Sequence, residues 1–501
     1  MARTRPAEAA DADSGARVRL AREAQRGWAA VPLRARLEVV RRLRQRLATD
    51  AEALLATLAG RAGRSPGESV AAELLPLADA CRFLERSAER LLAPQRFGRR
   101  GRPAWLFGHA AEIWREPLGV VLVIAPDNYP LLLPGVQLLQ ALAAGNAVLV
   151  KPAPGCSAPL ALLLDWMRRE GLPPGVAQLL GEGVEHAQGA LRAGVDHVVL
   201  TGSAETGRAV LAELAPRLTP AAMELSGCDA VFVLPGAELG MVAEALAFGL
   251  RLNGGATCIA PRRVFVTRGE AAALEQLLAA RIAALEPVPV APRARDRLEP
   301  LLAEAEGRGA RFVPARPSPD DPRFPATALF DVDPGSALLR ADLFAPILAV
   351  VAVADMDDAV RLNGLCPYGL GASIFGPAEA ARALAREVDA GSITINDLIV
   401  PTADPRLPFG GRRASGFGVT RGADGLLALT RGKTVALRHG SFRPHYAAPD
   451  PAQLEAALGY LRAAHAAGWR ERARGLKALL GGLRRLSRSS ASGTRPPTAP
   501  R

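Results

Sequence analysis

Cysteine, aromatic residues and long uncharged stretches are all scarce in this 501-residue sequence. The five cysteines lie at irregular distances and form no CxxC pair, so we expect reduced thiols in a cytoplasm rather than disulfides, and no metal site is indicated. No uncharged apolar run is long enough to require a membrane span. Residues 1–16 are charged and rich in alanine without an apolar core, and we expect no signal peptide.

What the sequence does contain, 49% hydrophobic and 22% charged residues, suits a globular protein of two or three domains. Its net charge of +12 is unevenly distributed. Between Arg438 and Arg501 there are 12 Lys and Arg residues against three acidic residues. The basic character therefore belongs mainly to a C-terminal tail.

The hydrophobic pattern changes along the chain. Residues 16–97 carry apolar side chains at steps of three and four, which is typical of helices. From Pro117 onward, short β-branched runs alternate with helical patterns, which predicts βαβ units around a parallel sheet. A ligand of such a sheet binds beyond the carboxyl ends of the strands, where Asn128, Lys151 and Gly202 fall. The expected strands are 120–124, 147–150, 197–200 and 231–234, and the expected helices between them include 131–144 and 159–170.

One thiol lies among small residues beside a fixed turn. Cys258 follows Gly254, Gly255 and Ala256 and precedes an Ala-Pro dipeptide. Small neighbours leave room for a substrate and let backbone N–H groups approach an oxygen, so Cys258 is a candidate nucleophile. By itself a lone cysteine is more often a small buried apolar residue than a catalyst.

Nine short segments in one order carry a family resemblance. The segments are 117–121, 126–130, 145–152, 201–207, 224–227, 253–263, 342–346, 396–400 and 408–411. On these segments the chain resembles the aldehyde dehydrogenase superfamily over about residues 15–438, and its later motifs look most like the class 3 or fatty-aldehyde branch. The resemblance implies an α/β fold of two open parallel-sheet domains, one Rossmann-like for the cofactor and one catalytic, plus an oligomerisation arm. It also implies oxidation of an aldehyde to a carboxylic acid with NAD or NADP, through a thiohemiacetal and a thioester on the cysteine.

The resemblance also assigns roles to individual residues. Cys258 becomes the nucleophile, Glu224 the general base and Asn128 the side-chain donor of the oxyanion hole. On the cofactor side, Lys151 matches the lysine at the adenosine ribose. The dinucleotide loop corresponds to Gly202, Ser203 and Gly207, and the nicotinamide end to Asp342 and Phe344. From the residues alone, surface strand ends, a helix cap and a turn are the alternatives.

Two of the positions that depart from the family pattern bear directly on the predicted chemistry. Pro154 stands where many relatives have a Glu that binds the ribose hydroxyls and disfavours a 2′-phosphate, so we expect NADP to be tolerated or preferred. Asp127 stands where relatives usually have an aromatic residue, and a carboxylate there would oppose a nearby oxyanion unless it points away.

Two alternatives to the oxidation of an aldehyde to an acid remain. A coenzyme-A-acylating dehydrogenase or acyl reductase could share the fold and the thiol without needing Glu224. A binding protein on the same fold, without catalysis, is the other.

The expected domain boundaries follow from these motifs. We expect a disordered segment 1–15, a cofactor domain 16–228 that includes an arm at 103–116, a catalytic domain 229–410, and a return segment with an oligomerisation strand at 411–438.

The tail 439–501 is basic and amphipathic and is expected to be partly disordered. A solvated helix or contact with an anionic membrane surface would both fit, whereas nucleic acid is disfavoured because aromatic residues are not interleaved with the basic ones. The relatives imply a homodimer.

Overall fold

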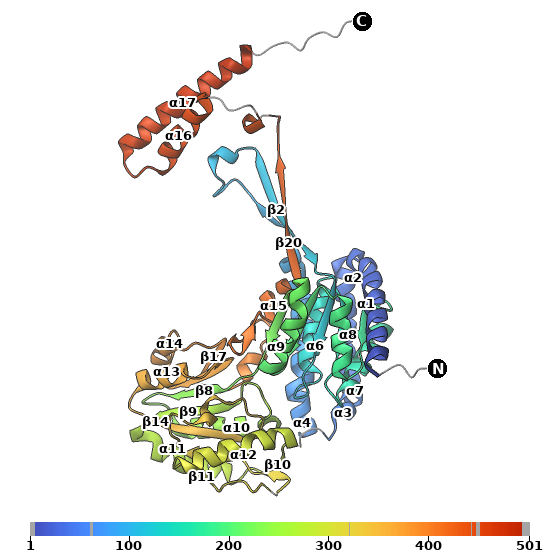
Figure 1. Cartoon of the computed structure of the whole chain (residues 1–501), viewed down its shortest axis with the longest axis vertical. Helices are drawn as coiled ribbons and strands as arrows, with labels where there is room; N and C mark the ends of the chain where they lie inside the picture. Colours follow the sequence, from blue (N-terminus) through green and yellow to red (C-terminus); the bar gives the residue numbers. More distant parts are fainter. Residues whose placement is uncertain (1–5, 61–63, 320, 442, 447–450, 493–501) are drawn as a thin grey trace. The chain divides into compact units, whose positions relative to one another are not determined.

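The computed structural model describes residues 6–60, 64–319, 321–441, 443–446 and 451–492. Contacts divide the chain into two compact units. One is formed by Met1–Arg96 and Glu112–Val435, the other by Phe97–Ala111 and Ala436–Arg501. Two sheets, each with helices on both faces, make up most of the first unit (Figure 1).

The described part of the chain begins with helix α1 (Pro6–Ala30), so the prediction of disorder over residues 1–15 is wrong from Pro6 onward. Helix α1 packs against α8 (Val184–Ala193). The buried hydroxyl of Ser14 on α1 donates a hydrogen bond to the carbonyl of His186 on α8 at 3.0 Å. Short alanine and serine side chains allow this close contact.

The first sheet has six strands in the order β19–β7–β6–β3–β4–β5, parallel except for the short β19. Successive residues of β3 pack into hydrophobic clusters on opposite faces of the sheet. Val121 and Val123 pack on the face covered by α2, α5, α6 and α7. Val120 and Leu122 pack on the face covered by α1, α8 and α9. The strands are β3 (Val120–Ile124), β4 (Ala147–Lys151), β5 (Ala177–Leu179), β6 (His197–Thr201), β7 (Ala221–Glu224) and β19 (Gly416–Phe417). The helices are α2 (Leu33–Thr49), α3 (Ala51–Leu58), α5 (Leu75–Leu92), α6 (Leu132–Ala143), α7 (Ser157–Arg169) and α9 (Ala204–Leu214).

The second sheet has seven strands in the order β11–β13–β14–β9–β8–β16–β17, with only β11 antiparallel. Helices α10 and α11 cover one face, and α12, α13 and α14 the other. The strands are β8 (Asp229–Val233), β9 (Pro261–Thr267), β11 (Arg311–Val313), β13 (Thr327–Phe330), β14 (Ile347–Val353), β16 (Gly371–Phe375) and β17 (Ser392–Ile395). The helices are α10 (Leu239–Arg251), α11 (Arg268–Ile282), α12 (Pro292–Gly307), α13 (Met356–Gly364) and α14 (Ala378–Leu384).

The strands and helices predicted from periodicity are confirmed, with ends that differ by at most two residues. The first sheet ends at β7, apart from β19, and the second begins at β8, as expected from the change of motif near residue 228. The arm predicted at 103–116 contains β2 (His109–Pro117), which lies between β1 (Gln95–Phe97) and β20 (Thr430–Arg438) in a three-stranded sheet.

The tail is more ordered than the sequence predicts. Residues 451–492 form two helices, α16 (Pro451–His465) and α17 (Trp469–Ser492), which pack against each other. The expectation of partial disorder is therefore wrong for these residues, whereas residues 447–450 and 493–501 lie outside the described part. Among the described residues, no helix has the length and apolarity needed to cross a bilayer.

Candidate active site

Parallel pairing brings four predicted site residues to one edge of the first sheet. Lys151 ends β4 beside Ile124 of β3, and Glu224 ends β7 beside Thr201 of β6. Because the carboxyl ends of these strands coincide, the loops that carry Asn128 and Gly202 leave the sheet at the same edge.

The Cys258 segment lies against two other motifs. A Cβ added at Gly227 would come within 2.2 Å of the Cys258 carbonyl oxygen, so the end of the Glu224 motif touches the cysteine backbone. A Cβ at Gly255, which has φ +73°, would meet the Ala345 carbonyl at 2.5 Å. Glycine is required at both positions because the backbones approach so closely. The Glu224 motif, the Cys258 segment and the 342–346 motif are therefore in contact in the fold.

Cys258 itself is half-buried and packs against Ile259, Leu370 and Phe409. Burial raises the pKa of its thiol above the usual range, and the carboxylates of Glu224 and Asp229 raise it further, while Arg421 acts in the opposite direction. The thiol is therefore protonated near neutral pH in this arrangement. Its reaction as a nucleophile requires the proton to move to a base.

Glu224 is a buried carboxylate with one free oxygen. Its Oε2 accepts a hydrogen bond from the Thr420 hydroxyl at 3.0 Å, while Oε1 has no hydrogen-bond partner among the described residues. Burial raises its pKa, whereas the positive charge of Arg421 and the Thr420 hydrogen bond lower it. A buried carboxylate with a free oxygen and a raised pKa suits a general base that acts on water.

Arg421, which we did not predict, adopts a strained backbone conformation beside the base. Its φ of 63° and ψ of 172° lie in a region used almost only by glycine. The guanidinium donates to the Thr402 carbonyl at 2.8 Å and lies 4.5 Å from the centre of the Phe409 ring. The residue before Arg421, Thr420, is fixed by two backbone hydrogen bonds with Phe409, since the N–H of each residue donates to the carbonyl of the other. Strain of this kind is typical of functional positions.

Asn128 contacts the cysteine segment directly. Its side-chain Nδ2 donates to the Ala256 carbonyl at 3.1 Å, two residues before Cys258, and its Oδ1 accepts the backbone N–H of Tyr129. The Nδ2 group has a second N–H, which can serve a substrate oxygen. Asp127 is exposed to solvent.

Behind Asn128 lies a buried polar network that sequence reasoning missed. Arg64 forms an ion pair with the fully buried Glu73 at 2.7 Å and donates to the Asn253 Oδ1 at 2.6 Å. Asn253 in turn donates to the carbonyls of Asn128 and Ala256 at 3.1 and 3.0 Å. The network thus fixes the loop of the oxyanion donor to the loop of the nucleophile.

The residues predicted to hold the adenosine end differ in their contacts. Lys151 is buried, and burial lowers the pKa of its ammonium group. Ser203 caps α9 by accepting the Thr206 N–H at 3.1 Å. The Gly202 N–H donates to the Glu224 carbonyl at 3.0 Å, so it joins β6 to β7 and does not face a phosphate. The N–H groups of the first turn of α9 have no intrahelical acceptor and suit a pyrophosphate.

At the nicotinamide end, Asp342 has a buried Oδ1 atom without a partner among the described residues. Burial raises its pKa, and a hydrogen bond with Ser226 and the charge of Arg262 lower it. Such an orphaned acceptor suits a ribose hydroxyl donor. Phe344, two residues later, is half-buried. The residues present therefore fit a nicotinamide dinucleotide.

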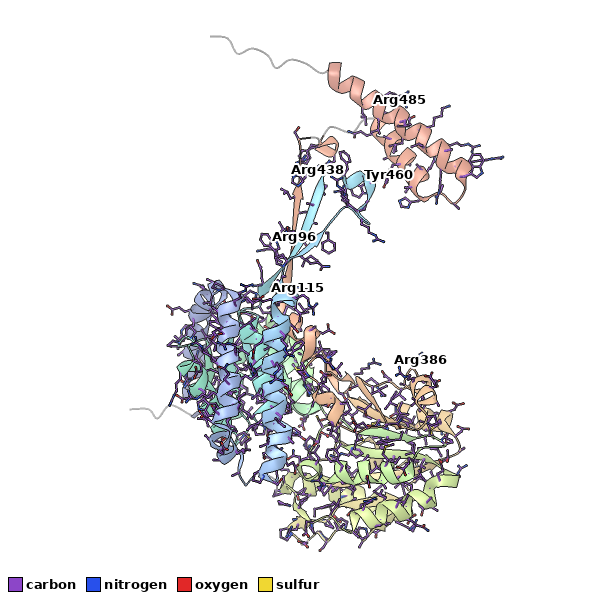
Figure 2. All side chains as sticks on the ribbon, turned by 180° about the vertical axis from the view of Figure 1, so that it is seen from behind. Arg96, Arg115, Arg386, Arg438, Tyr460 and Arg485 are labelled. Carbon is purple, nitrogen blue, oxygen red and sulfur yellow. The ribbon has the colours of Figure 1, made fainter. Side chains whose placement is uncertain are left out.

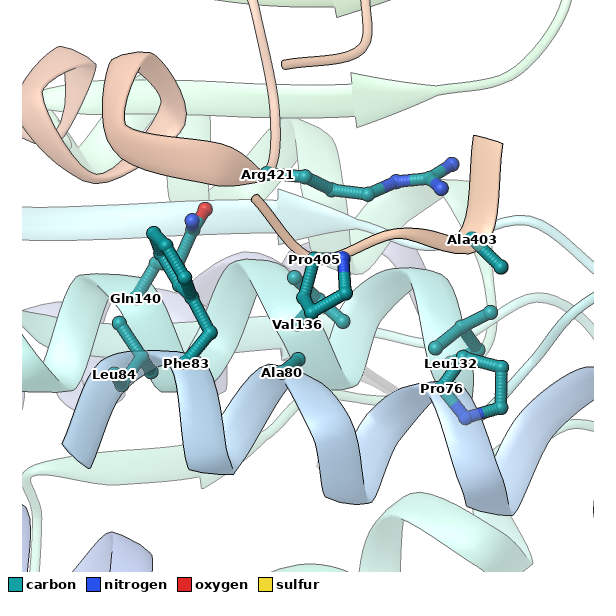
Figure 3. Close-up of a pocket in the computed structure, with 10 residues that line it drawn as sticks. All are labelled: Pro76, Ala80, Phe83, Leu84, Leu132, Val136, Gln140, Ala403, Pro405 and Arg421. Carbon is teal, nitrogen blue, oxygen red and sulfur yellow. The ribbon is translucent and has the colours of Figure 1, made fainter. Parts of the chain in front are cut away.

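A small apolar pocket of about 20 Å³ lies between α5, α6 and residues 403–405. Figure 3 shows Leu132 and Val136 of α6 facing Pro405, with the Arg421 side chain extended along the opposite wall. Arg421 also acts electrostatically on Glu224 and Cys258, so it connects the pocket with the reactive groups.

Comparisons with known proteins agree with this arrangement. Residues 1–435 match the aldehyde dehydrogenase family. The chain is 31% identical to a 4,4′-diapolycopene aldehyde oxidase of a Methylomonas species, over 80% of this chain and 77% of that one. It is 29% identical to a geranial dehydrogenase of Castellaniella defragrans, over 84% and 90% of the two chains. An NAD⁺-bound aldehyde dehydrogenase of Mycobacterium tuberculosis superposes with a TM-score of 0.79 at 26% identity, covering 86% of this chain and 92% of that chain. The chain belongs to the aldehyde dehydrogenase family.

Proposed function

We propose that this protein oxidises apolar aldehydes to carboxylic acids with NAD or NADP. The observation that carries the proposal is that the Cys258 segment is in contact with Asn128 and with the end of the Glu224 motif, and that the Glu224 carboxylate acts on the Cys258 thiol. Since Cys258 packs against the apolar residues Ile259, Leu370 and Phe409, we infer medium-chain aliphatic and aromatic aldehydes as substrates.

In the proposed mechanism the Cys258 sulfur attacks the aldehyde carbon while its proton leaves to Glu224 or water. The Asn128 amide and the Cys258 N–H stabilise the oxyanion of the thiohemiacetal. A bound nicotinamide cofactor supplies the hydride acceptor. Glu224 then removes a proton from the water that attacks the thioester, which releases the acid and restores the thiol. Lys151 and Asp342 would hold the two ribose groups. The N–H groups of Ala204 and Glu205 in the first turn of α9 would face the pyrophosphate, whereas the Gly207 N–H is already bonded to the Ser203 carbonyl at 2.9 Å.

The choice between the two cofactors depends on charge near Lys151. The exposed Pro154 brings no carboxylate, which favours tolerance of a 2′-phosphate. Glu182, on the neighbouring loop between β5 and α8, nevertheless places a carboxylate against the Pro154 loop, where it accepts the N–H groups of Gly155 at 2.8 Å and Ser157 at 3.1 Å. These hydrogen bonds lower its pKa and keep it ionised. We expect both cofactors to be accepted.

We also propose a homodimer located in the cytoplasm, with the basic tail 439–501 in contact with a membrane surface. An acylating reaction with coenzyme A is disfavoured, because a buried carboxylate beside the thiol serves hydrolysis and has no role in acyl transfer. A binding protein would not need these reactive groups together.

The test is reduction of NAD and NADP with a panel of aliphatic and aromatic aldehydes, with and without coenzyme A, by wild type and Cys258→Ala. Turnover that is independent of coenzyme A and lost in the variant supports the proposal. A requirement for coenzyme A would favour the acylating reaction. A folded wild type that turns over none of the aldehydes would favour a binding role.

A further inference from the structure

The two C-terminal helices pack through their smallest residues. A Cβ added at Gly459 of α16 would lie 2.3 Å from the Leu479 backbone N, and one added at Gly475 of α17 would lie 2.4 Å from the Ala463 backbone N. Gly482 approaches the backbone of Ala456 in the same way. The contact between the helices is therefore made largely of glycine and alanine, with the partly buried Leu479 beside them.

The large apolar side chains of this hairpin point elsewhere. Seven leucine and tryptophan side chains are between 39% and 74% exposed. On α17 they follow steps of seven, four and three residues, which place them along one side of the helix. They are Leu454, Leu458 and Leu461 on α16, and Trp469, Leu476, Leu480 and Leu483 on α17.

A seven-residue repeat explains this division. Glycine, an apolar residue and a basic residue follow each other three times, at 468–470, 475–477 and 482–484. Gly468 lies just before α17 and is exposed, whereas Gly475 and Gly482 are buried against α16. Successive residues are about 100° apart around a helix, so the apolar line lies beside these two glycines and the basic line follows. Figure 2 shows the side chains of this hairpin, with Tyr460 and Arg485 labelled.

The charge of the hairpin selects its partner. Residues 451–492 contain eight Lys and Arg residues and two Glu residues. Arg474 pairs with Glu471, and Arg485 pairs with Glu455, so both carboxylates are already in ion pairs. A second copy of the same surface would meet it with like charge, whereas an anionic surface would meet it with opposite charge.

We propose that this hairpin binds the surface of an anionic phospholipid membrane, with the apolar line of α17 among the acyl chains and the basic line at the headgroups. Leucines beside a line of basic residues are typical of helices that lie in the interface, and Trp469, which Arg470 covers at 5.5 Å, suits the headgroup level. The inference deepens the proposed function, on which it rests, because apolar aldehydes partition into lipid and the enzyme would meet them there.

The test is flotation of the full-length protein with vesicles of phosphatidylcholine alone or with about 30% phosphatidylglycerol, at about 0.1 M and about 0.5 M salt. We expect binding to the anionic vesicles to be at least tenfold stronger and to weaken at the higher salt. A leucine variant, Leu476→Gln with Leu480→Gln, should lose most of its binding to the anionic vesicles. In a basic variant, Arg470→Gln with Lys477→Gln, the binding affinity should fall about fivefold per residue. Two double variants of exposed residues in the first unit are the matched controls. The control for the leucine variant is Leu277→Gln with Leu365→Gln, and the control for the basic variant is Arg382→Gln with Arg386→Gln.

Equal binding to neutral vesicles, no binding, or unchanged binding of the leucine variant would overturn the proposal. A change in oligomeric mass of that variant without lipid, by light scattering, would assign the face to a second copy instead. Turnover of a water-soluble aldehyde is measured on each preparation. A wild type that does not bind anionic vesicles but retains turnover overturns only this inference, whereas a wild type that binds lipid without turnover overturns only the dehydrogenase.

Discussion

Replacing Arg421 by Gln removes the positive charge that opposes the effect of burial on Glu224. Burial raises the pKa of that carboxyl, and the field of Arg421 is the largest influence that lowers it, ahead of the Thr420 hydrogen bond. The Arg421→Gln variant should therefore raise the Glu224 pKa further. Since the proposed hydrolysis needs the carboxylate, the acid limb of the kcat–pH profile should move to higher pH.

The size of the effect follows from one charge at the edge of a buried site. At an effective dielectric constant of roughly 20 to 40 and a separation of roughly 7 Å, a unit charge is worth about 1 to 2 kcal/mol. On the acid limb this corresponds to a decrease in turnover of about five- to thirtyfold. Well above the pKa, where Glu224 is ionised in both proteins, turnover should be unchanged.

The assay is steady-state kcat against pH, combined with single-turnover reduction of the cofactor to separate hydride transfer from hydrolysis. Arg431→Gln, an exposed arginine on β20, is the matched control. An acid limb that stays in place or moves to lower pH would refute the electrostatic reasoning. A variant that is equally slow at every pH would show that Arg421 acts through structure or binding.

Three further predictions concern Asn128, Asp229 and Glu182. Asn128→Ala should lower kcat about a hundredfold or more, the usual cost of one oxyanion donor, and near-normal turnover would remove it from the mechanism. Burial raises the pKa of Asp229 to about 7, so the folded protein holds this proton more tightly than the unfolded chain and loses stability as pH rises through 7. Between about pH 5 and about pH 8 the Tm of Asp229→Asn should therefore fall less than the Tm of the wild type. Equal decreases in Tm would contradict this reasoning. Glu182→Gln should raise the kcat/KM ratio of NADP to NAD by about tenfold, and an unchanged ratio would mean that its charge does not reach the cofactor.

The parts of the fold that local sequence determines were predictable. β-Branched runs such as Val120–Ile124 are strands because they are buried on both faces, and their alternation with helical segments specifies a parallel sheet. The sheet edge then brings Asn128, Lys151 and Glu224 together, because the carboxyl ends of parallel strands coincide. The position of Cys258 beside them came from the family resemblance.

The supports of the site were not predictable in this way. Arg64, Glu73 and Asn253 belong to a short loop, a π-helical turn and a 3₁₀ turn, and no periodicity relates them. Each side chain is polar, and a sequence pattern assigns such residues to the surface. Only the tertiary arrangement shows that Glu73 is buried and satisfied by Arg64 and by two backbone N–H groups.

The same distinction explains the tail. Its leucines and arginines predicted an amphipathic helix, but an amphipathic pattern by itself assigns the leucines to the protein interior. The structure shows that glycines occupy the buried line and that the leucines lie outside it. In water, a helix pair that buries glycine and exposes leucine gains no stabilisation from burial of those leucine side chains. This is the arrangement expected of helices that complete their packing against lipid, where small residues make the contact between helices.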